Sequence, residues 1–309
     1  MKNIPDLREV PDLPSEIKEA ALDGGLVLFV GAGVSKRVKL PGWPTLALNV
    51  LEDLLDKGFL NYSELEQLKV LEPKKQLSIA RLIAEEKKYE LDFTVYFEKK
   101  ESKSEIYKDL NAIGCPCVTT NYDELLEPKF FETDDGSTTP TSIKRIFEKK
   151  EFFSGHLNEP GTVIHLHGAI SAPHTMVVTT KEYLEHYDDD MVKDFLGELF
   201  AKKTVLFLGY GLEEEEILEH ILRKGSVRNI IEKRRFALQG FFFSEKPLYE
   251  KLYDYYLKTF GVHLIGFVRD YKDYEQLDDI IKSWALKIVV RKPALVEDFK
   301  FMGEVLGDA

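Results

Sequence analysis

The feature that most constrains the fold of this chain is an apolar run, residues 26–30, that stops at a short glycine loop. The run reads Leu-Val-Leu-Phe-Val and is followed at 31–35 by Gly-Ala-Gly-Val-Ser. Five consecutive apolar residues are typical of a strand buried on both faces of a parallel sheet. Glycines at its end permit close approaches that a side chain would block, and free loop amides can bind phosphate. The segment therefore predicts a nucleotide-binding turn.

Taken alone, the glycine loop has a second interpretation. It lacks the third glycine of a G-x-G-x-x-G motif, and Pro41 and Pro44 interrupt the chain before any helix is expected to begin. An ordinary turn between a strand and a loop would fit the same residues. The glycine loop alone does not distinguish a nucleotide-binding turn from an ordinary turn, so the other motifs of the chain are needed.

Composition narrows the class of protein. Hydrophobic residues make up 44% of the 309 and charged residues 31%, as in soluble globular proteins with a large core. No apolar stretch approaches the roughly 20 residues that span a bilayer, and the first residues lack the apolar segment of a secretory signal. We therefore expect a cytoplasmic protein without membrane association.

Charge and cysteine content exclude two kinds of ligand. The net charge of −12 argues against duplex DNA or RNA as the main ligand, because phosphate backbones need a positive surface. Cys115 and Cys117 are the chain's two cysteines and lie too close together for an ordinary disulfide, which fits a reducing cytosol. They cannot form a four-cysteine zinc site within one chain. We expect no resident metal.

Buried strands alternate with helices along the chain, which predicts an α/β fold with a Rossmann-like, doubly wound parallel sheet. A helical insertion at about 57–112 and a loop at 133–142 interrupt the alternation. Further strands are expected at 116–119, 162–166, 204–208, 236–243 and 262–268, and helices at 14–24, 45–55, 180–202, 213–224, 246–260 and 274–286.

Four of the predicted strands end in polar or glycine-rich segments. These are the loop at 31–35, Thr120-Asn121, His167-Gly168 and Gly209-Tyr210-Gly211. In open α/β sheets, ligands bind outside the carboxyl ends of the strands. The four segments are therefore expected to converge on one crevice.

These four segments, in this order, resemble the SIR2 (sirtuin) superfamily. Sirtuins carry a G-A-G-x-S loop, a T-Q-N-x-D segment, an H-G step and a later glycine- or serine-containing turn. The chain matches them with Gly-Ala-Gly-Val-Ser at 31–35, Thr-Thr-Asn-Tyr-Asp at 119–123, His167-Gly168, and Gly-Tyr-Gly at 209–211. The resemblance implies an NAD-binding catalytic domain over residues 14–290, followed by a C-terminal tail at 291–309.

Two departures indicate a particular branch. Sirtuin deacylases have a four-cysteine zinc ribbon after the H-G step, whereas residues 169–203 contain no cysteine, so we expect no zinc ribbon. Thr120 also stands where those enzymes have glutamine. Both features look like the bacterial SIR2-like branch that hydrolyses NAD in anti-phage defence. The resemblance implies an NAD-depleting effector of abortive infection that works as a homo-oligomer or with a partner protein such as an ATPase or a sensor.

The resemblance and the chemistry together assign the site residues. Amides of Gly31, Ala32 and Gly33 and the hydroxyl of Ser35 are expected to hold the pyrophosphate of NAD. Asn121, beside Thr120, would orient a water molecule or the ribose hydroxyls. Asp123 matches the residue that holds the nicotinamide carboxamide, although the cap of a helix at 124–130 is an alternative. Gly209 and Gly211 would admit the adenosine half.

His167 is the candidate general base, since histidine titrates near neutral pH and Gly168 leaves room beside it. His165 lies two residues earlier, so strand alternation gives both the same face, and we interpret the deeper His165 as structural. The acidic run at 213–216 is interpreted as the start of a helix, although one of its carboxylates could reach a ribose hydroxyl. Trp43 is predicted to pack in the core or a loop.

Three functions stay open at this point. The leading one is an NAD⁺ glycohydrolase that releases nicotinamide and ADP-ribose, with cyclisation of NAD as a competing outcome at the same intermediate. The second is an NAD-dependent protein deacylase, which lacks its zinc module here. The third is a sensor that binds NAD or ADP-ribose without turnover, against which the presence of both Asn121 and His167 argues.

Overall fold

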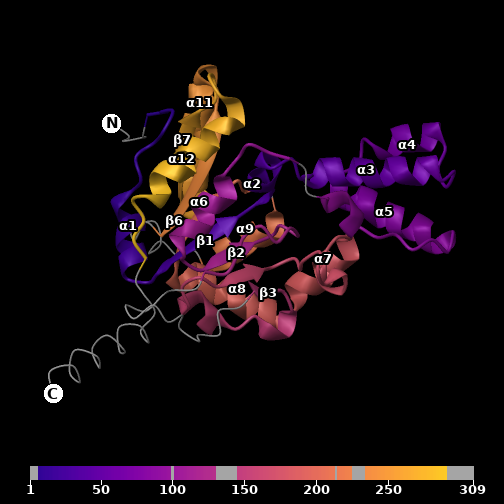
Figure 1. The fold of residues 1–309 in the computed structure, drawn as a ribbon, viewed down its shortest axis with the longest axis horizontal. Coiled ribbons are helices and arrows are strands. Elements are labelled where there is room, and N and C mark those ends of the chain that lie inside the picture. Colours follow the sequence, from indigo (N-terminus) through magenta and orange to yellow (C-terminus); the bar gives the residue numbers. More distant parts are fainter. Residues whose placement is uncertain (1–5, 99–100, 130–144, 213, 225–233, 291–309) are drawn as a thin grey trace.

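A parallel sheet forms the centre of the computed structural model, which describes residues 6–98, 101–129, 145–212, 214–224 and 234–290 (Figure 1). The predicted loop at 133–142 and the tail at 291–309 lie outside the described residues. The seven strands of the sheet are all parallel and lie in the order β3-β4-β2-β1-β5-β6-β7. They are β1 (Leu26–Val30), β2 (Cys117–Thr119), β3 (Arg145–Ile146), β4 (Val163–His165), β5 (Thr204–Leu208), β6 (Arg235–Phe241) and β7 (Val262–Val268).

Helices cover both faces of the sheet, which confirms the predicted doubly wound fold. On one face Leu26, Leu28 and Val30 of β1 pack with α1 (Ser15–Leu22), α6 (Ile106–Ile113) and α12 (Gln276–Ala285). On the other face Val27 and Phe29 share a core with α7 (Thr180–Asp188), α8 (Asp190–Lys202), α9 (Glu215–Lys224) and α11 (Lys246–Phe260). Because side chains alternate along a strand, a central strand covered on both sides must be apolar throughout.

A short helix directly after the glycine loop corrects one expectation. We expected no helix to begin before Pro41 and Pro44, but α2 (Ala32–Arg37) begins at the first residue after Gly31. Both prolines come after it, and Pro44 occupies the first turn of α3 (Trp43–Asp56), where a missing N–H is tolerated. The strand therefore leads straight into a helix, as in nucleotide-binding folds.

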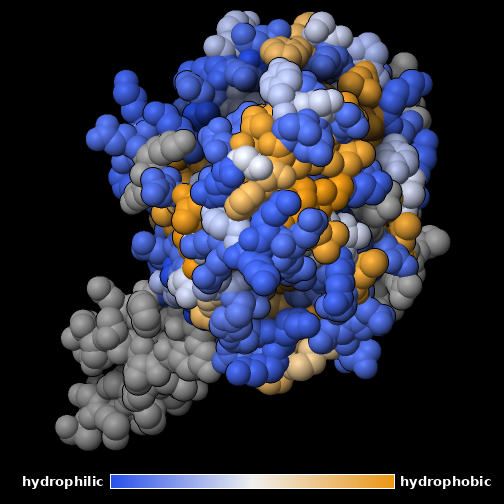
Figure 2. Space-filling model, turned by 90° about the vertical axis from the view of Figure 1, so that its right-hand side faces the viewer, coloured by the Kyte–Doolittle hydropathy of each residue, from blue (hydrophilic) through white to orange (hydrophobic). Residues whose placement is uncertain are grey.

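A second core forms among helices that extend away from the sheet (Figure 1). Leu46, Val50 and Leu54 of α3 pack there against α4 (Tyr62–Leu68), α5 (Pro73–Glu86) and the 3₁₀ helix η1 (Thr94–Phe97). Figure 2 looks onto this end of the molecule and shows apolar residues gathered among hydrophilic ones. Exposed hydrophobic side chains on α5 and α7 include Leu82 and Leu184. The proposed insertion bounds of 57–112 and the domain bounds of 14–290 stay predictions.

The remaining elements are short 3₁₀ helices in the connections. They are η2 (Lys149–Glu151), η3 (Ser154–Asn158), η4 (Pro173–Thr175), η5 (Phe243–Glu245) and η6 (Asp273–Glu275). Across the part of the chain that the structure describes, none of the helices has the length and apolar character needed to cross a membrane. The same residues contain no cluster of three or more histidine, cysteine or acidic side chains suited to a metal ion.

Candidate functional site

The four predicted motifs lie at one edge of the sheet. Strands β4, β2, β1 and β5 are consecutive and parallel, so their carboxyl ends are neighbours. Backbone hydrogen bonds continue past the strand ends, from the Gly31 amide to the Leu208 carbonyl at 2.9 Å and from the Leu166 amide to the Thr119 carbonyl at 2.8 Å. This edge is where open α/β folds bind their ligands.

The two glycine motifs are in direct contact with each other. A Cβ atom on Gly33 would lie 2.7 Å from the Gly209 carbonyl oxygen, and one on Gly31 would lie 2.8 Å from the same atom. Gly209 has φ +60°, a conformation that favours glycine. The Gly33 amide donates to the Gly209 carbonyl at 2.8 Å. The amides of Gly31 and Gly33 therefore bond to β5 and its following turn, and both glycines allow a close approach between the two backbones.

A small cavity opens beside the β1 and β2 ends. One part of its wall is polar, with Ser35, Thr120, Asn121 and Asp123, and another part is apolar, with Trp43, Leu46 and Phe97; Ala32, Pro41, Gly42 and Tyr122 complete it. Five predicted site residues are therefore brought together, namely Ala32, Ser35, Thr120, Asn121 and Asp123. The lining does not include Gly31, Gly33, His167, Gly209 or Gly211.

Asn121 has one half of its side-chain amide fixed and the other half unoccupied. Its Nδ2 donates to the Gly31 carbonyl at 3.1 Å, and its backbone amide donates to Thr119 Oγ1 at 3.0 Å. Thr119 Oγ1 in turn donates to the Val30 carbonyl at 2.8 Å. Asn121 Oδ1 is buried without a hydrogen-bond partner in the described structure, and the residue lines the cavity. A buried acceptor of this kind is ready to receive a ligand hydroxyl or a water molecule.

Ser35 and Asp123 form a buried network with Tyr107 of α6. Ser35 Oγ donates to Asp123 Oδ2 at 2.6 Å and lies 2.9 Å from the Tyr107 hydroxyl. Because the one serine proton goes to the carboxylate, the tyrosine must donate to Ser35. Burial raises the pKa of Asp123, and the hydrogen bond from Ser35 opposes that rise. The alternative for Asp123 as the cap of a helix at 124–130 is wrong, since residues 124–129 form no helix.

His165 has a structural role in this arrangement. Its ring is fully buried, and Nδ1 lies 3.1 Å from the backbone carbonyl oxygen of Asn121. Burial lowers the pKa of His165 to about 4, so it is neutral at physiological pH. The neutral ring donates from Nδ1 and fixes the backbone that carries Asn121, in line with its interpretation as the structural histidine.

His167 lies past the end of β4 and contacts α7 instead of the cavity. Its Nε2 is 2.7 Å from the Tyr187 hydroxyl and its Nδ1 is 3.2 Å from the Tyr183 hydroxyl. The side chain is fully buried, and burial, followed by the charges of His186 and Lys74, lowers its pKa well below 6.5. Tyr183 also packs edge-on against Trp43, a cavity residue, at 5.7 Å between ring centroids. One aromatic ring therefore contacts both His167 and the cavity wall.

Glu214 reaches the same cluster and was not assigned to the site from the sequence. The acidic run was expected to begin a solvated helix, but α9 starts at Glu215 and Glu214 precedes it with its side chain 17% exposed. Its Oε2 lies 3.9 Å from His167 Nε2. Burial raises the pKa of Glu214 to about 7, against the opposing effects of the Tyr210 hydroxyl and Lys74. Nothing in an acidic run of the sequence distinguishes the one carboxylate that turns inward.

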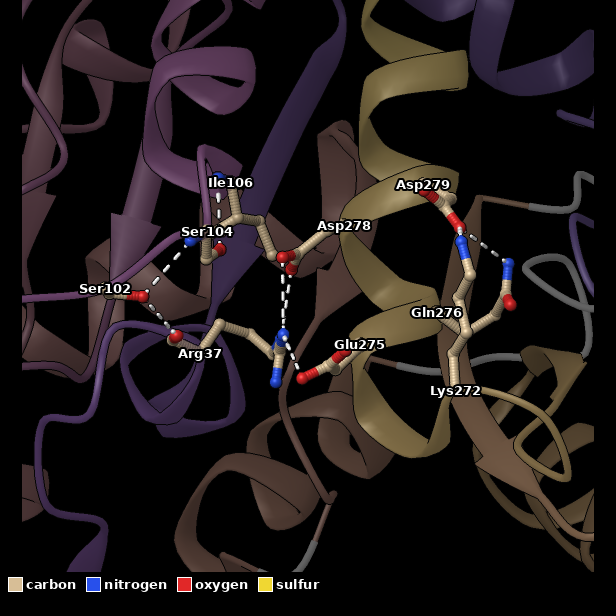
Figure 3. Close-up of polar contacts among 9 residues, drawn as sticks. All are labelled: Arg37, Ser102, Ser104, Ile106, Lys272, Glu275, Gln276, Asp278 and Asp279. Carbon is tan, nitrogen blue, oxygen red and sulfur yellow. Dashed lines mark hydrogen bonds and ion pairs between the residues drawn. The ribbon is translucent and has the colours of Figure 1, made fainter.

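The α2 helix is fixed from outside the cavity by an ion pair with α12 (Figure 3). Arg37 donates from Nε to Asp278 Oδ1 at 3.0 Å and from Nη2 to Asp278 Oδ2 at 3.4 Å. The Arg37 carbonyl accepts from Ser102 Oγ at 2.9 Å, and Glu275 lies 3.8 Å from the guanidinium. A forked arginine–carboxylate pair holds geometry well, so the end of α2, two residues after Ser35, is anchored to α12 in the neighbouring helix layer.

Comparison with known proteins shows which family of domains this chain resembles. Residues 117–265, from β2 into β7, match a family model described as a SIR2-like domain. The chain is 26% identical to "Defense-associated sirtuin 2" of Bacillus subtilis over 218 residues. That alignment covers 65% of this chain and 19% of the relative. The chain thus spans about a fifth of the length of that relative. The matched segment contains Asn121, Asp123, His167 and Gly209, and the resemblance to a SIR2-like domain is confirmed.

Proposed function

We propose, on the premise that this chain carries a SIR2-like domain, that the protein is an NAD⁺ glycohydrolase. It would cleave the bond between nicotinamide and ribose with water and release nicotinamide and ADP-ribose. The observation that carries this proposal is the unoccupied Oδ1 of Asn121 in the wall of a cavity whose other polar residues are Ser35, Thr120 and Asp123. NAD would enter as the substrate.

The chemistry matches the groups in and around the cavity. Cleavage builds positive charge on the anomeric carbon, as in glycoside hydrolysis, so the water must be placed and deprotonated as the bond opens. Asn121 Oδ1 accepts a hydrogen bond from that water or from a ribose hydroxyl. Nicotinamide is a flat ring with a carboxamide, which suits a site lined both by the aromatic rings of Trp43 and Phe97 and by the polar side chain of Asp123.

The direct test is incubation of the purified protein with NAD, with chromatography of the products and calorimetry of NAD binding. Asn121→Ala and His167→Ala should each reduce nicotinamide release by at least about 100-fold, the range that positioned acid–base groups contribute. His174→Ala is the matched control, because that histidine is exposed and pairs with Glu148 away from the cavity. Activity that survives both site changes, or a protein that neither binds nor cleaves NAD, would rule the proposal out.

A second candidate, an NAD- or ADP-ribose-binding protein without turnover, is favoured by one observation. Both ring nitrogens of His167 lie within hydrogen-bond distance of tyrosine hydroxyls, and His167 is outside the cavity lining. A base held in this way needs a rearrangement of Tyr183 or Tyr187 before it can reach a substrate. Tight binding of NAD with no nicotinamide release, under every condition tested, would select this candidate.

The relative's name supports a proposal for the biological role. Similarity to a defence-associated sirtuin supports a role in defence. We propose that this role is the one that the SIR2 resemblance implies, an NAD-depleting effector of anti-phage defence in the cytoplasm that acts as a homo-oligomer or with a partner such as an ATPase or a sensor. Bacteria that express the chain with its natural neighbours should lose NAD after phage infection, and His167→Ala should abolish that loss. Solution mass would establish the oligomer. Survival of phage-infected cells without any change in NAD would refute the role.

A further inference from the structure

A buried carboxylate faces His167 across a short gap. Glu214 Oε2 lies 3.9 Å from His167 Nε2 and has no hydrogen-bond partner in the described structure. Glu214 follows the Gly209-Tyr210-Gly211 turn directly ahead of α9, so the end of β5 delivers it to the histidine at the end of β4. An unpartnered carboxylate oxygen in a buried place is costly, and such groups call for a function.

The other charged groups near His167 have partners of their own. Lys74 of α5 pairs with Glu216 of α9 at 2.7 Å, and its ammonium lies over the Tyr183 ring at 4.3 Å from the centroid. Among the described residues, the other groups that face the histidine and Glu214 are the hydroxyls of Tyr183, Tyr187 and Tyr210 and the imidazole of His186. The His186 and His167 ring centroids are 5.8 Å apart. Glu214 is therefore the acid placed to balance a positive charge on His167.

We infer that Glu214 is a positioning residue that stabilises the imidazolium of His167 when that histidine accepts a proton during NAD cleavage. This inference rests on the proposed function, because it assigns a partner to the proposed base. The tyrosine hydroxyls orient the ring through both of its nitrogens but carry no charge, whereas an ionised Glu214 supplies one at short range.

The reaction balances with these groups alone. The electron pair of the bond between the ribose C1′ and the nicotinamide nitrogen goes to the nitrogen, which leaves as neutral nicotinamide. Oxygen of water bonds to C1′, and a proton from that water passes to His167 directly or through a ribose hydroxyl. The imidazolium then stands beside the Glu214 carboxylate until the proton is released to solvent, which gives nicotinamide, ADP-ribose and one proton.

This role makes activity depend on the ionisation of Glu214. Burial raises the pKa of Glu214 to about 7, so the carboxylate is charged above that pH and neutral below it. The nicotinamide-release rate of the wild type should therefore rise through an apparent pKa near 7. Glu214→Gln should lower kcat by about 100-fold and remove that rise, and Glu214→Asp should restore part of both. Glu219→Gln, at an exposed acid on α9, which follows Glu214, is the matched control and should keep the wild-type profile.

A measurement without NAD separates this inference from the proposed function. In protein with ¹³C-labelled histidine, the Cε1–H signal of His167 is identified among the seven histidines by its loss in His167→Gln. That signal should shift with an inflection near pH 7 in the wild type and lose the inflection in Glu214→Gln. Identical His167 titration in the two proteins, or identical pH profiles of activity, would overturn the inference. A wild type that shows the inflection but does not cleave NAD would overturn the proposed function and leave the Glu214–His167 coupling supported. Glu214→Asp provides the same comparison if the glutamine variant does not fold.

Discussion

Replacing Gly33 by alanine tests whether the glycine loop is built for backbone contact. The added Cβ would lie 2.7 Å from the Gly209 carbonyl oxygen and 2.9 Å from its Cα. Both atoms belong to the backbone at the end of β5, so no side-chain rotation can relieve the contact. The β1–α2 connection would have to move away from β5, and with it Ser35 in the cavity wall.

Two opposing effects set the change in the free energy of unfolding of Gly33→Ala. Overpacking against a rigid neighbour costs about 1–3 kcal/mol, and more when the backbone must shift. Alanine within α2 returns up to about 1 kcal/mol of helix propensity. We therefore expect the free energy of unfolding to fall by about 1–2 kcal/mol, which lowers Tm by roughly 2–6 °C in a chain of this size.

The assay is urea unfolding of wild type, Gly33→Ala and Gly25→Ala, with NAD turnover measured in parallel. Gly25 lies at the other end of β1, and a Cβ there would have its nearest neighbour, the Ala20 carbonyl oxygen, at an ordinary 3.7 Å. Gly25→Ala should stay within about 0.5 kcal/mol of the wild type or be slightly more stable. Equal stability of Gly33→Ala and Gly25→Ala would refute the packing argument.

Three further outcomes follow from the described contacts. The pKa of Glu214 is raised from 4.5 to about 7 in the folded protein, so ionisation of Glu214 opposes folding. As the pH rises from 5 to 8, the free energy of unfolding of Glu214→Gln should gain up to roughly 3 kcal/mol over that of the wild type. A difference between the two proteins that does not change with pH would contradict the buried carboxylate. Arg37→Lys loses the forked pair to α12 and should lower the free energy of unfolding by about 1–2 kcal/mol. Glu275→Gln, at a side chain that is itself 71% exposed, should change it by less than about 0.5 kcal/mol in the same titration. Tyr107→Phe removes the buried donor to Ser35 and should cost about 1–2 kcal/mol by thermal unfolding, while a neutral change would show that the network carries no free energy.

The parts of the fold that the sequence predicted are those with a local signal. The bounds of β1, β5 and β7 match the expected runs at 26–30, 204–208 and 262–268, because continuous apolar runs mark central strands. The two-residue β3 (Arg145–Ile146) was missed, since two residues are too few to show a period. The six-residue α2 was missed for the same reason, and the prolines after it were given too much weight.

The site shows the same division between local and tertiary information. The sequence located Asn121, Asp123 and Ser35, which share a cavity, because each belongs to a short motif at a strand end. Tyr107 and Glu214 were missed, because their importance comes from packing between segments far apart in the chain. Position along a helix or within an acidic run does not encode which neighbour a side chain will meet.

The contact between the two glycine motifs gives them a structural role that the sequence did not indicate. Each was interpreted from the sequence as a place where a ligand approaches the backbone. In the structure Gly31 and Gly33 approach the Gly209 turn, and the Gly31 and Gly33 amides bond to the carbonyls of Leu208 and Gly209. Without that approach β1 and β5 could not end at the same level, and Asn121, whose Nδ2 is held by the Gly31 carbonyl, would lose its anchor. The glycines therefore support the cavity through the position of Asn121. If Asn121 places the water as proposed, Gly33→Ala should reduce NAD turnover chiefly through kcat, because it displaces that residue.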